Sequence, residues 1–483
     1  MVIESLKYKI LQQFGFAPTQ EQGQALDTFV SFLTDRDPQA VMILRGSAGT
    51  GKTSLSGAIV RTLLQIRQKV MLLAPTGRAA KVFSLGSGAP AYTIHRRIYR
   101  EKAFAGVDGQ FSLNDNLYTD TLFMVDEASM IANMGLGGTT FGSGCLLDDL
   151  VKFVYQGHND RLLLIGDKAQ LPPVGEEESP ALSASVMEGY GLKVYECDLN
   201  EVLRQSQSSG ILYNATLIRQ MITHDAVTGL PLVRFKGFAD IVMMPGAELV
   251  ESLGDSYHHV GMDETMVITR SNKRANIYNN GIRNMVLDRE EELSSGDMLM
   301  IVKNNYFWTE KEKKESGEGS AAAVPAFLAN GDRAKVLRVS NYIELYGFRF
   351  ATLLLQLPDY DDYEMQVTGM LDTLQSEAPA LTHEQQEELF RQVEEDYQHF
   401  VPLKADRMKS IRQDAYFNAL QIKYAYAVTC HKAQGGQWAH VYVDQGYMTD
   451  DMLTPDYIHW LYTAFTRATD KLFLVNWPKE QTC

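Results

Sequence analysis

Apolar residues in the first half of the chain fall into short continuous runs separated by longer amphipathic stretches. Four of these runs occupy residues 41–44, 70–74, 121–125 and 162–165. Short apolar runs without alternation predict strands buried on both faces, as in a parallel sheet. The intervening stretches, such as residues 54–68, place apolar residues at helical spacing and predict covering helices. The pattern therefore predicts an α/β domain.

The second half of the chain restarts this pattern and adds sequence rich in alternating residues. Residues 267–272 predict a strand that leads into a helix, and residues 441–443 and 472–475 predict further buried strands. Alternation over residues 334–357 instead predicts a small β-barrel-like module. The second half therefore predicts another α/β domain with a β-rich insertion.

Four further stretches predict local structure. Residues 1–40 have helical spacing and predict two helices, and residues 381–414 predict a polar helix or helical arm. A turn signal between aromatic residues at 104–111 predicts a small β hairpin. The charged, glycine-containing run at 308–320 predicts an exposed loop.

Length and composition bound the class of protein. A chain of 483 residues is too long for one core and predicts about three domains. A hydrophobic content of 45% and a charged content of 22% are typical of a soluble globular protein. No signal peptide or membrane span is evident, so a cytoplasmic protein without a membrane partner is expected. Four widely separated cysteines form no C-x-x-C pair and predict neither a metal site nor a disulfide: Cys145, Cys197, Cys430 and Cys483.

The net charge of −15 argues against a protein that coats nucleic acid nonspecifically. Sequence-independent affinity for DNA comes from lysine and arginine neutralising phosphates, and here carboxylates outnumber them. A narrow basic channel on an acidic body remains compatible with this charge balance.

A phosphate-binding loop follows the first buried run. Gly46, Gly51, Lys52 and Thr53 fill the G-x-x-x-x-G-K-[ST] pattern between a predicted strand and a predicted helix. Glycines let successive backbone N–H groups point inward, and the helix N-terminus adds partial positive charge. Lys52 can reach the β and γ oxygens of a nucleotide, and the Thr53 hydroxyl can bind Mg²⁺. The loop predicts ATP and Mg²⁺ as cofactors.

Polar residues follow two other buried runs. Asp126 and Glu127 end the third run, where adjacent carboxylates are costly unless a cation receives them. Asp126 can therefore bind Mg²⁺, and Glu127 can align and deprotonate the attacking water. Gln170 follows the fourth run and can sense the γ-phosphate. Gln22 lies in a predicted helix start, where capping alone accounts for a glutamine.

Taken together, the ordered motifs resemble those of superfamily 1 helicases, specifically the 5′-to-3′ branch (superfamily 1B) with RecD-type and phage Dda-type enzymes. The likeness runs from Pro18 to Val475. It implies an α/β fold of two RecA-like P-loop NTPase domains with an inserted 1B hairpin and an SH3-like β-barrel 2B subdomain. The implied bounds are 1–205 for domain 1A, with 1B at about 85–120, and 206–483 for domain 2A, with 2B at about 326–420.

The resemblance implies a role for each matched residue of the nucleotide site. Gln22 matches the adenine-reading glutamine, and Arg204 and Arg467 match the two arginine fingers. The implied catalytic residues are Lys52, Glu127, Gln170, Arg204 and Arg467. The implied nucleotide-binding residues are Gln22, Gly46, Gly49, Gly51, Lys52, Thr53, Gln434 and Gly435, with Thr53 and Asp126 on the metal.

The resemblance also implies a channel for single-stranded DNA. Its matched residues are Thr76, Gly77, Arg78, Thr93, His95, Thr429, His431 and Lys432. Contacts of this kind hold the backbone and predict little sequence specificity. Phe104 or Phe111 in the hairpin is the candidate strand-separating wedge. The family often has serine where Ala433 stands, so one hydrogen bond of the pattern is missing.

The leading hypothesis is an ATP-dependent 5′-to-3′ DNA helicase that translocates on single-stranded DNA and unwinds duplex at single-strand/duplex junctions. A monomer with replication, repair or recombination partners is expected. The alternative is a single-stranded-DNA-dependent ATPase that displaces bound proteins with little unwinding, because its motor residues look the same. RNA as the loading strand stays open. A P-loop kinase or nucleotide-gated binding module is disfavoured, because neither needs a second domain that carries residues 429–435 and 462–467.

Overall fold

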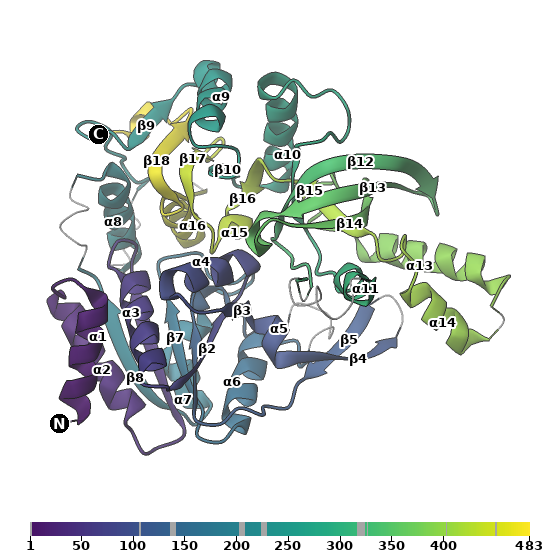
Figure 1. Cartoon of the computed structure of the whole chain (residues 1–483). Helices are drawn as coiled ribbons and strands as arrows, with labels where there is room; N and C mark the ends of the chain where they lie inside the picture. Colours follow the sequence, from purple (N-terminus) through teal and green to yellow (C-terminus); the bar gives the residue numbers. More distant parts are fainter. Residues whose placement is uncertain are drawn as a thin grey trace. The chain divides into compact units, whose positions relative to one another are not determined.

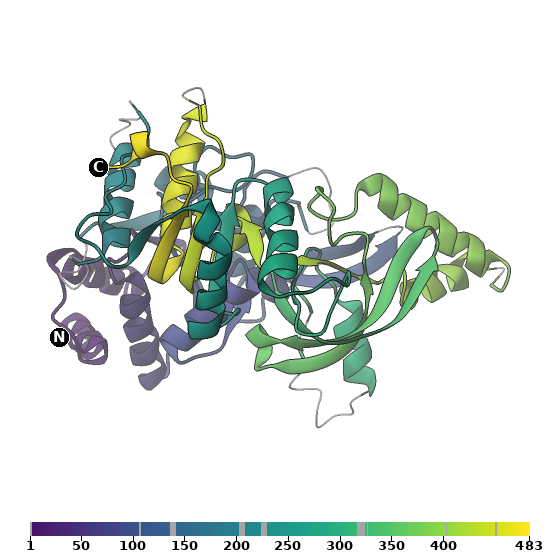
Figure 2. The same ribbon diagram turned by 90° about the horizontal axis from the view of Figure 1, so that it is seen from above.

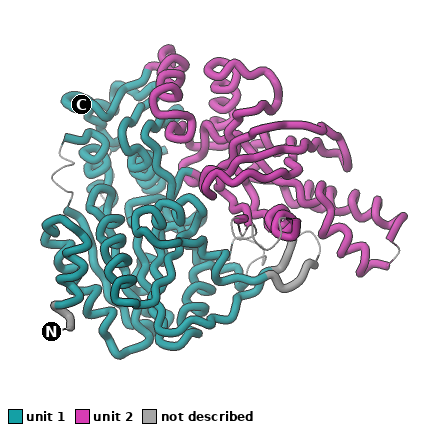
Figure 3. The backbone as a smooth tube through the Cα atoms, viewed as in Figure 1, with its two compact units in different colours: residues 1–101, 111–244, 433–483 teal, residues 102–110, 245–432 magenta. Residues whose placement is uncertain are grey.

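The computed structural model describes residues 2–105, 108–135, 142–201, 208–223, 229–315, 324–325, 327–401, 403–449 and 452–483. These residues form two compact units (Figure 3). Unit 1 contains residues 1–101, 111–244 and 433–483, and unit 2 contains residues 102–110 and 245–432. Each unit draws on separate segments of the chain, so the boundary expected near residue 205 stays a prediction.

Unit 1 contains a six-stranded sheet in which all neighbouring strands run parallel. Its strand order is β3-β2-β6-β7-β1-β8. The strands are β1 (Ala40–Gly46), β2 (Lys69–Ala74), β3 (Ala91–Thr93), β6 (Thr121–Val125), β7 (Arg161–Gly166) and β8 (Lys193–Leu199). The four apolar runs of the first half lie in β1, β2, β6 and β7, so these predicted strands are confirmed.

Helices cover both faces of this sheet, which explains why its strands are apolar without alternation (Figure 1). Met42 and Leu44 of β1 pack in one core with residues of α1 (Val2–Phe14), α2 (Gln20–Leu33), α3 (Lys52–Gln65) and α4 (Gly77–Ser87). Val41 and Ile43 face the opposite core, with residues of α5 (Ile94–Ile98), α6 (Leu146–Gln156) and α7 (Ala184–Gly189). The two predicted N-terminal helices are confirmed as α1 and α2.

The last part of the chain returns to unit 1. There β17 (Trp438–Asp444), β18 (Ala468–Val475) and β9 (Ile241–Met244) pair in parallel, in that order. Helices α8 (Gly210–Thr223) and α16 (Pro455–Phe465) pack against each other. The predicted strands at 441–443 and 472–475 are therefore confirmed. The short helical turns of unit 1 are η1 (Ala128–Met130), η2 (Pro180–Leu182) and η8 (Lys479–Gln481).

Unit 2 is built around a closed five-stranded barrel, which confirms the predicted β module. Its strands are β11 (Met298–Ile301), β12 (Arg333–Leu345), β13 (Phe348–Leu357), β14 (Tyr363–Met370) and β15 (Leu420–Tyr424). Helices α13 (His383–Gln398) and α14 (Lys404–Arg412) form the predicted polar arm beside the barrel strands (Figures 1 and 2). Leu389 and Val393 of α13 anchor the arm by packing in one core with Phe350 of β13.

Unit 2 also carries the strand pair β10 (Thr265–Thr269) and β16 (Ala427–Thr429), which run parallel. The remaining elements are α9 (Leu249–His259), α10 (Asn272–Gly281), α11 (Phe307–Glu315), the four-residue α15 (Cys430–Ala433), and the turns η4 (Gly246–Glu248), η5 (Ile282–Val286) and η6 (Pro358–Tyr360). The strand and helix predicted from residue 267 are thus β10 and α10.

One prediction for this region is wrong. The charged run expected to be an exposed loop begins inside helix α11 (Phe307–Glu315). Trp308 is only 5% exposed, and its indole N–H donates to the Asn418 carbonyl at 2.9 Å. Burial of this one aromatic side chain stabilises the helix despite the surrounding charges. The prediction from the sequence rested on those charges alone and did not take the burial into account. Residues 316–323 of the run lie outside the described residues.

The predicted hairpin is present as β4 (Tyr99–Ala105) and β5 (Asp108–Leu113), which pair with each other. Residues 106–107 of its turn and the Phe104 side chain lie outside what is described. Phe111 packs against a hydrophobic core of unit 1. Phe111 is half-buried there, and the choice of a wedge residue stays a prediction.

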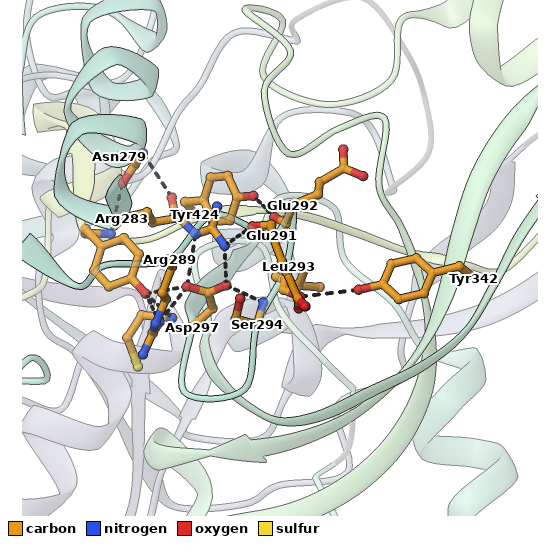
Figure 4. A network of polar contacts seen from close by, with 12 residues as sticks. Asn279, Arg283, Arg289, Glu291, Glu292, Leu293, Ser294, Asp297, Tyr342 and Tyr424 are labelled. Atoms are coloured by element: carbon orange, nitrogen blue, oxygen red, sulfur yellow. Dashed lines mark hydrogen bonds and ion pairs between the residues drawn. The ribbon is translucent and has the colours of Figure 1, made fainter. Parts of the chain in front are cut away.

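A buried polar cluster ties the barrel to the strand pair inside unit 2 (Figure 4). Asp297 precedes β11 and is 0% exposed; it accepts hydrogen bonds from Arg283 at 3.1 and 3.0 Å and from Arg289 at 2.6 Å. The Tyr426 hydroxyl, on the link between β15 and β16, donates to the same carboxylate at 2.7 Å. This cluster fixes the point at which the chain leaves the barrel for β16. Among the described residues, no helix is long and apolar enough to cross a membrane.

Candidate nucleotide and nucleic-acid sites

The phosphate loop joins β1 to α3 and needs its glycines. Gly49 and Gly51 have φ angles of 77° and 81°, a region that glycine enters without strain. A Cβ added at Gly46 would lie 2.9 Å from Lys52 Cγ, so a larger residue would displace the lysine. The Lys52 ammonium donates to the carbonyls of Gly46 and Ser47, the latter at 2.9 Å. The loop therefore holds a cation over its own neutral oxygens, where phosphate oxygens would bind it more strongly.

Gln22 is tied to this loop from α2. Its side-chain amide donates to the Thr50 carbonyl at 2.9 Å, and its carbonyl accepts from the Thr19 N–H at 3.0 Å. Thr19 and Gln22 form a capping box at the start of the helix. The helix-start interpretation of Gln22 is thus confirmed, and the same amide supports the phosphate loop. Its role in reading adenine stays a prediction.

The acidic pair ends β6 with an unusual backbone. Glu127 has φ 53° and ψ 37°, a left-handed conformation that costs a non-glycine residue free energy and that clusters at functional sites. Its N–H donates to Asp126 at 2.9 Å. Burial and the Glu127 charge raise the pKa of Asp126 to about 7. A half-buried carboxylate with a raised pKa fits a divalent cation, which would offset its unfavourable charge.

Thr53 follows Lys52 at the start of α3, with its side chain exposed. Hydroxyl and carboxylate oxygens are the hard ligands that Mg²⁺ prefers, and a nucleotide-bound ion takes most other ligands from phosphate and water. Thr53 and Asp126 together therefore fit the metal of a nucleotide complex.

Gln170 lies in a loop whose backbone is held firmly. Its carbonyl and that of Ala169 lie 3.2 and 2.9 Å from His459 Nδ1, and the Leu171 N–H donates to Thr463 Oγ1 at 2.8 Å. Gln434 donates to the Leu171 carbonyl at 2.7 Å. The Gln170 side-chain oxygen is buried and finds no hydrogen-bond partner within the described ranges. A fixed backbone with an unsatisfied side-chain oxygen is what we expect if the Gln170 side chain forms its hydrogen bond to a bound ligand.

Tyr462 is a site residue that the sequence reasoning missed. Its hydroxyl accepts from the Ala48 N–H of the phosphate loop at 3.0 Å and donates to Asp167 Oδ2 at 2.6 Å. Burial, followed by the Asp167 charge, raises the pKa of this phenol well above its usual value. A tyrosine on a buried helix face was the only signal, and that signal does not distinguish a site residue from core packing. A second missed residue, Arg219, donates to Ser47 of the loop.

The two expected arginine fingers have different outcomes. Arg467 is 2% exposed and donates to the carbonyls of Thr463 and Gly436, each at 3.1 Å. Its guanidinium thus holds the chain around the end of α16. Arg204 lies outside the described residues. The finger role of both stays a prediction.

The matched DNA residues of unit 1 lie at the starts of two helices. Thr76 caps α4 by accepting from the Ala79 N–H at 3.2 Å, and Thr93 caps α5 by accepting from the Arg96 N–H at 3.4 Å. Burial lowers the pKa of His95 to about 4, so this imidazole is neutral at pH 7. Gly77 is the first residue of α4.

Arg78 and Gly435 join α4 to the start of β17 within unit 1. The Arg78 guanidinium lies 4.6 Å from the Trp438 ring centroid and donates to the Gln437 carbonyl at 2.7 Å. Gly435 has φ 72°, and a Cβ there would lie 3.0 Å from Ala79 Cβ. Glycine is therefore required for this close approach.

The matched DNA residues of unit 2 follow β16. Thr429 ends this strand, and His431 and Lys432 lie in α15. Burial and the neighbouring charge of Lys423 lower the pKa of Lys432 to about 8. The DNA role of all eight matched residues stays a prediction.

Comparisons with known proteins agree with this architecture. Residues 17–229 match the family model of an AAA domain, and residues 424–475 match that of a UvrD-like helicase C-terminal domain. The "ATP-dependent RecD2 DNA helicase" of Deinococcus radiodurans is 30% identical over 157 residues, covering 32% of this chain and 18% of that protein. The "ATP-dependent DNA helicase dda" of Enterobacteria phage T4 is 26% identical over 267 residues, covering 53% of this chain and 55% of that protein.

Two further similarities extend over nearly the whole chain. An uncharacterized protein, R530, of Acanthamoeba polyphaga mimivirus is 22% identical and covers 91% of this chain and 96% of its own. The crystal structure of a Bacteroides Pif1 helicase with ADP-AlF3 and single-stranded DNA covers 96% of this chain and 94% of its own, at 13% identity and a TM-score of 0.47.

The phosphate-loop sheet is thus similar to an AAA domain, and the C-terminal segment is similar to that of UvrD-like helicases. The chain is similar to the RecD2 and Dda helicases over 32% and 53% of its length.

Proposed function

We propose that the chain is an ATP-dependent DNA helicase that moves 5′ to 3′ on single-stranded DNA and unwinds duplex ahead of it. The observation that carries this proposal is the position of α16 in unit 1. This helix comes from the last part of the sequence, yet Tyr462 contacts the phosphate loop and Thr463 contacts the Gln170 loop. A kinase or simple nucleotide switch has no need for such a helix beside its phosphate loop.

The residues of the site divide the chemistry of ATP hydrolysis. Lys52 neutralises charge on the transferred phosphoryl group, and Gln170 senses the γ-phosphate. Glu127 aligns the attacking water and accepts the proton that the water loses. Thr53 and Asp126 would hold Mg²⁺, which would supply further charge neutralisation.

Hydrolysis is coupled to movement through the loops that α16 contacts. Loss of the terminal phosphate removes contacts that the phosphate loop and the Gln170 loop make with the nucleotide. Helix α16 is hydrogen-bonded to both loops. Alternating grip by the matched residues before β4 and after β16 then moves the strand. Since these residues contact the nucleic-acid backbone, we expect little sequence preference. We also expect a monomeric motor that binds at single-strand/duplex junctions. The names of the RecD2 and Dda relatives support the helicase activity.

The test begins with Lys52→Ala, which should abolish DNA-stimulated ATP hydrolysis while leaving the protein folded. Lys9→Ala, which removes an exposed lysine of α1, is the matched control and should retain wild-type turnover. Turnover by Lys52→Ala at the wild-type rate would refute the assignment of the site.

Direction and activity are tested with duplexes that carry only a 5′ or only a 3′ single-stranded tail, in ATP and Mg²⁺. Unwinding of the 5′-tailed duplex alone is expected, and unwinding of the 3′-tailed duplex alone would overturn the direction. DNA-stimulated hydrolysis without strand separation would replace the helicase by a protein-displacing ATPase. The same assay with RNA loading strands tests the choice of DNA.

A further inference from the structure

An arginine outside the recognised motifs reaches the phosphate loop from α8. Arg219 is half-buried, donates to the Ser47 hydroxyl and lies 3.5 Å from Asn200 Oδ1. Ser47 is the second residue of the glycine-rich pattern and is 7% exposed. The guanidinium is therefore already at the wall of the phosphate cradle.

Lys52 and Arg219 converge on the same residue of the loop. The lysine donates to the Ser47 carbonyl at 2.9 Å, and the arginine donates to the Ser47 hydroxyl. Within the described part of the chain, neither cation has a carboxylate at ion-pair distance. Both cations donate to neutral acceptors of one residue, and an anion at this place would bind either of them more strongly. Phosphate oxygens are the preferred partners of both groups.

Helix α8 presents Arg219 from a fixed base. The N–H of Gly210 donates to Asp240 at 2.7 Å, and the Asn214 amide donates to the Arg234 carbonyl at 2.9 Å. A Cβ on Gly210 would lie 2.6 Å from Ile241 Cγ2, so the start of the helix lies tightly against β9. An arginine on a rigid element loses little further backbone entropy when it binds.

We propose that Arg219 is a phosphate-binding residue of the ATP site, which exchanges Ser47 for a terminal phosphate of the nucleotide. This inference rests on the proposed function only in naming ATP as the ligand. Because Lys52 reaches the β and γ oxygens and shares Ser47 with Arg219, the arginine binds the same end of the triphosphate. It is a cation additional to Arg204 and Arg467.

The test measures equilibrium binding of a fluorescent non-hydrolysable ATP analogue and of fluorescent ADP, in Mg²⁺ and without DNA. Loss of a charge-assisted hydrogen bond corresponds to about a 10- to 100-fold weaker affinity. Arg219→Ala and Arg219→Gln should each show this loss for the ATP analogue and a smaller one for ADP. Arg219→Lys should recover part of the affinity.

Leu217→Ala on the exposed side of α8 is the control for damage to the helix and should bind like the wild type. Thermal melting of each variant checks that it is folded. Unchanged affinity for the ATP analogue in Arg219→Ala, with affinity lost in Lys52→Ala, would overturn the role of Arg219 and leave the proposed function intact. Unchanged affinity in both variants would overturn the nucleotide site itself.

Discussion

The buried carboxylate of Asp297 offers a sharp test of how unit 2 is held together. It is 0% exposed, and its partner Arg283 is 4% exposed. Arg289, Tyr426 and the Ser294 N–H complete its hydrogen bonds at 2.6, 2.7 and 2.7 Å (Figure 4). Asp297→Asn keeps the shape of the side chain and removes its charge. Two guanidinium groups are then left around a neutral amide.

The expected loss follows from this geometry. Removing one partner of a buried ion pair costs about 3 to 5 kcal/mol, because the remaining charges stay desolvated. The carbonyl oxygen of the introduced amide can still accept a hydrogen bond, so we expect the lower end of that range, about 3 kcal/mol. Asp372→Asn is the matched control, because Asp372 pairs with Arg349 at 3.2 Å and their side chains are 28% and 47% exposed. An exposed pair of this kind contributes below about 1 kcal/mol.

Urea unfolding, followed by circular dichroism, gives the free energy for each variant. Hydrogen exchange of the β11 and β15 amides then tests whether the loss is local to the barrel and its link to β16. The reasoning fails if Asp297→Asn costs no more than Asp372→Asn, since burial would then not decide the strength of the pair.

Two further predictions concern a hydroxyl and a buried acid. Tyr462→Phe should lower kcat for ATP hydrolysis about tenfold with a smaller change in KM, because it removes the charge-assisted hydrogen bond that positions two loops. Tyr457→Phe removes a hydroxyl elsewhere on α16 and should leave kcat unchanged. Equal kinetics for the two variants would contradict the role of Tyr462. Burial raises the pKa of Asp332 from 3.8 to about 7, so stability that is present in acid is lost as the pH rises through about 7. Between pH 5 and pH 8, urea unfolding should show the wild type losing about 2 to 3 kcal/mol relative to Asp332→Asn. The difference in unfolding free energy between the wild type and Asp361→Asn, at an exposed aspartate, should not change with pH. If the difference between the wild type and Asp332→Asn is also constant between pH 5 and pH 8, the pKa of Asp332 is not raised.

Local patterns predicted much of the fold. The four apolar runs became β1, β2, β6 and β7 because a strand covered on both faces needs apolar residues at every position. Alternation over residues 334–357 predicted barrel strands for the corresponding reason, since one face packs inside and the other meets solvent or polar cover. Trp308 shows the limit, because one buried aromatic decided the structure of a segment that reads as charged and exposed.

The sequence by itself determined the phosphate loop, the acidic pair after β6 and the order of the motifs that resemble those of helicases. These features depend on residue types at short spacing, and the backbone geometry that they require is local. Only the tertiary structure decided three contacts: the hydrogen bond between Tyr462 and Ala48, the hydrogen bond from Arg219 to Ser47, and the ion pairs of Asp297 with two arginines. Each of those contacts joins segments whose approach is set by helix and strand packing, and no spacing in the sequence encodes which distant partner a buried polar group will find.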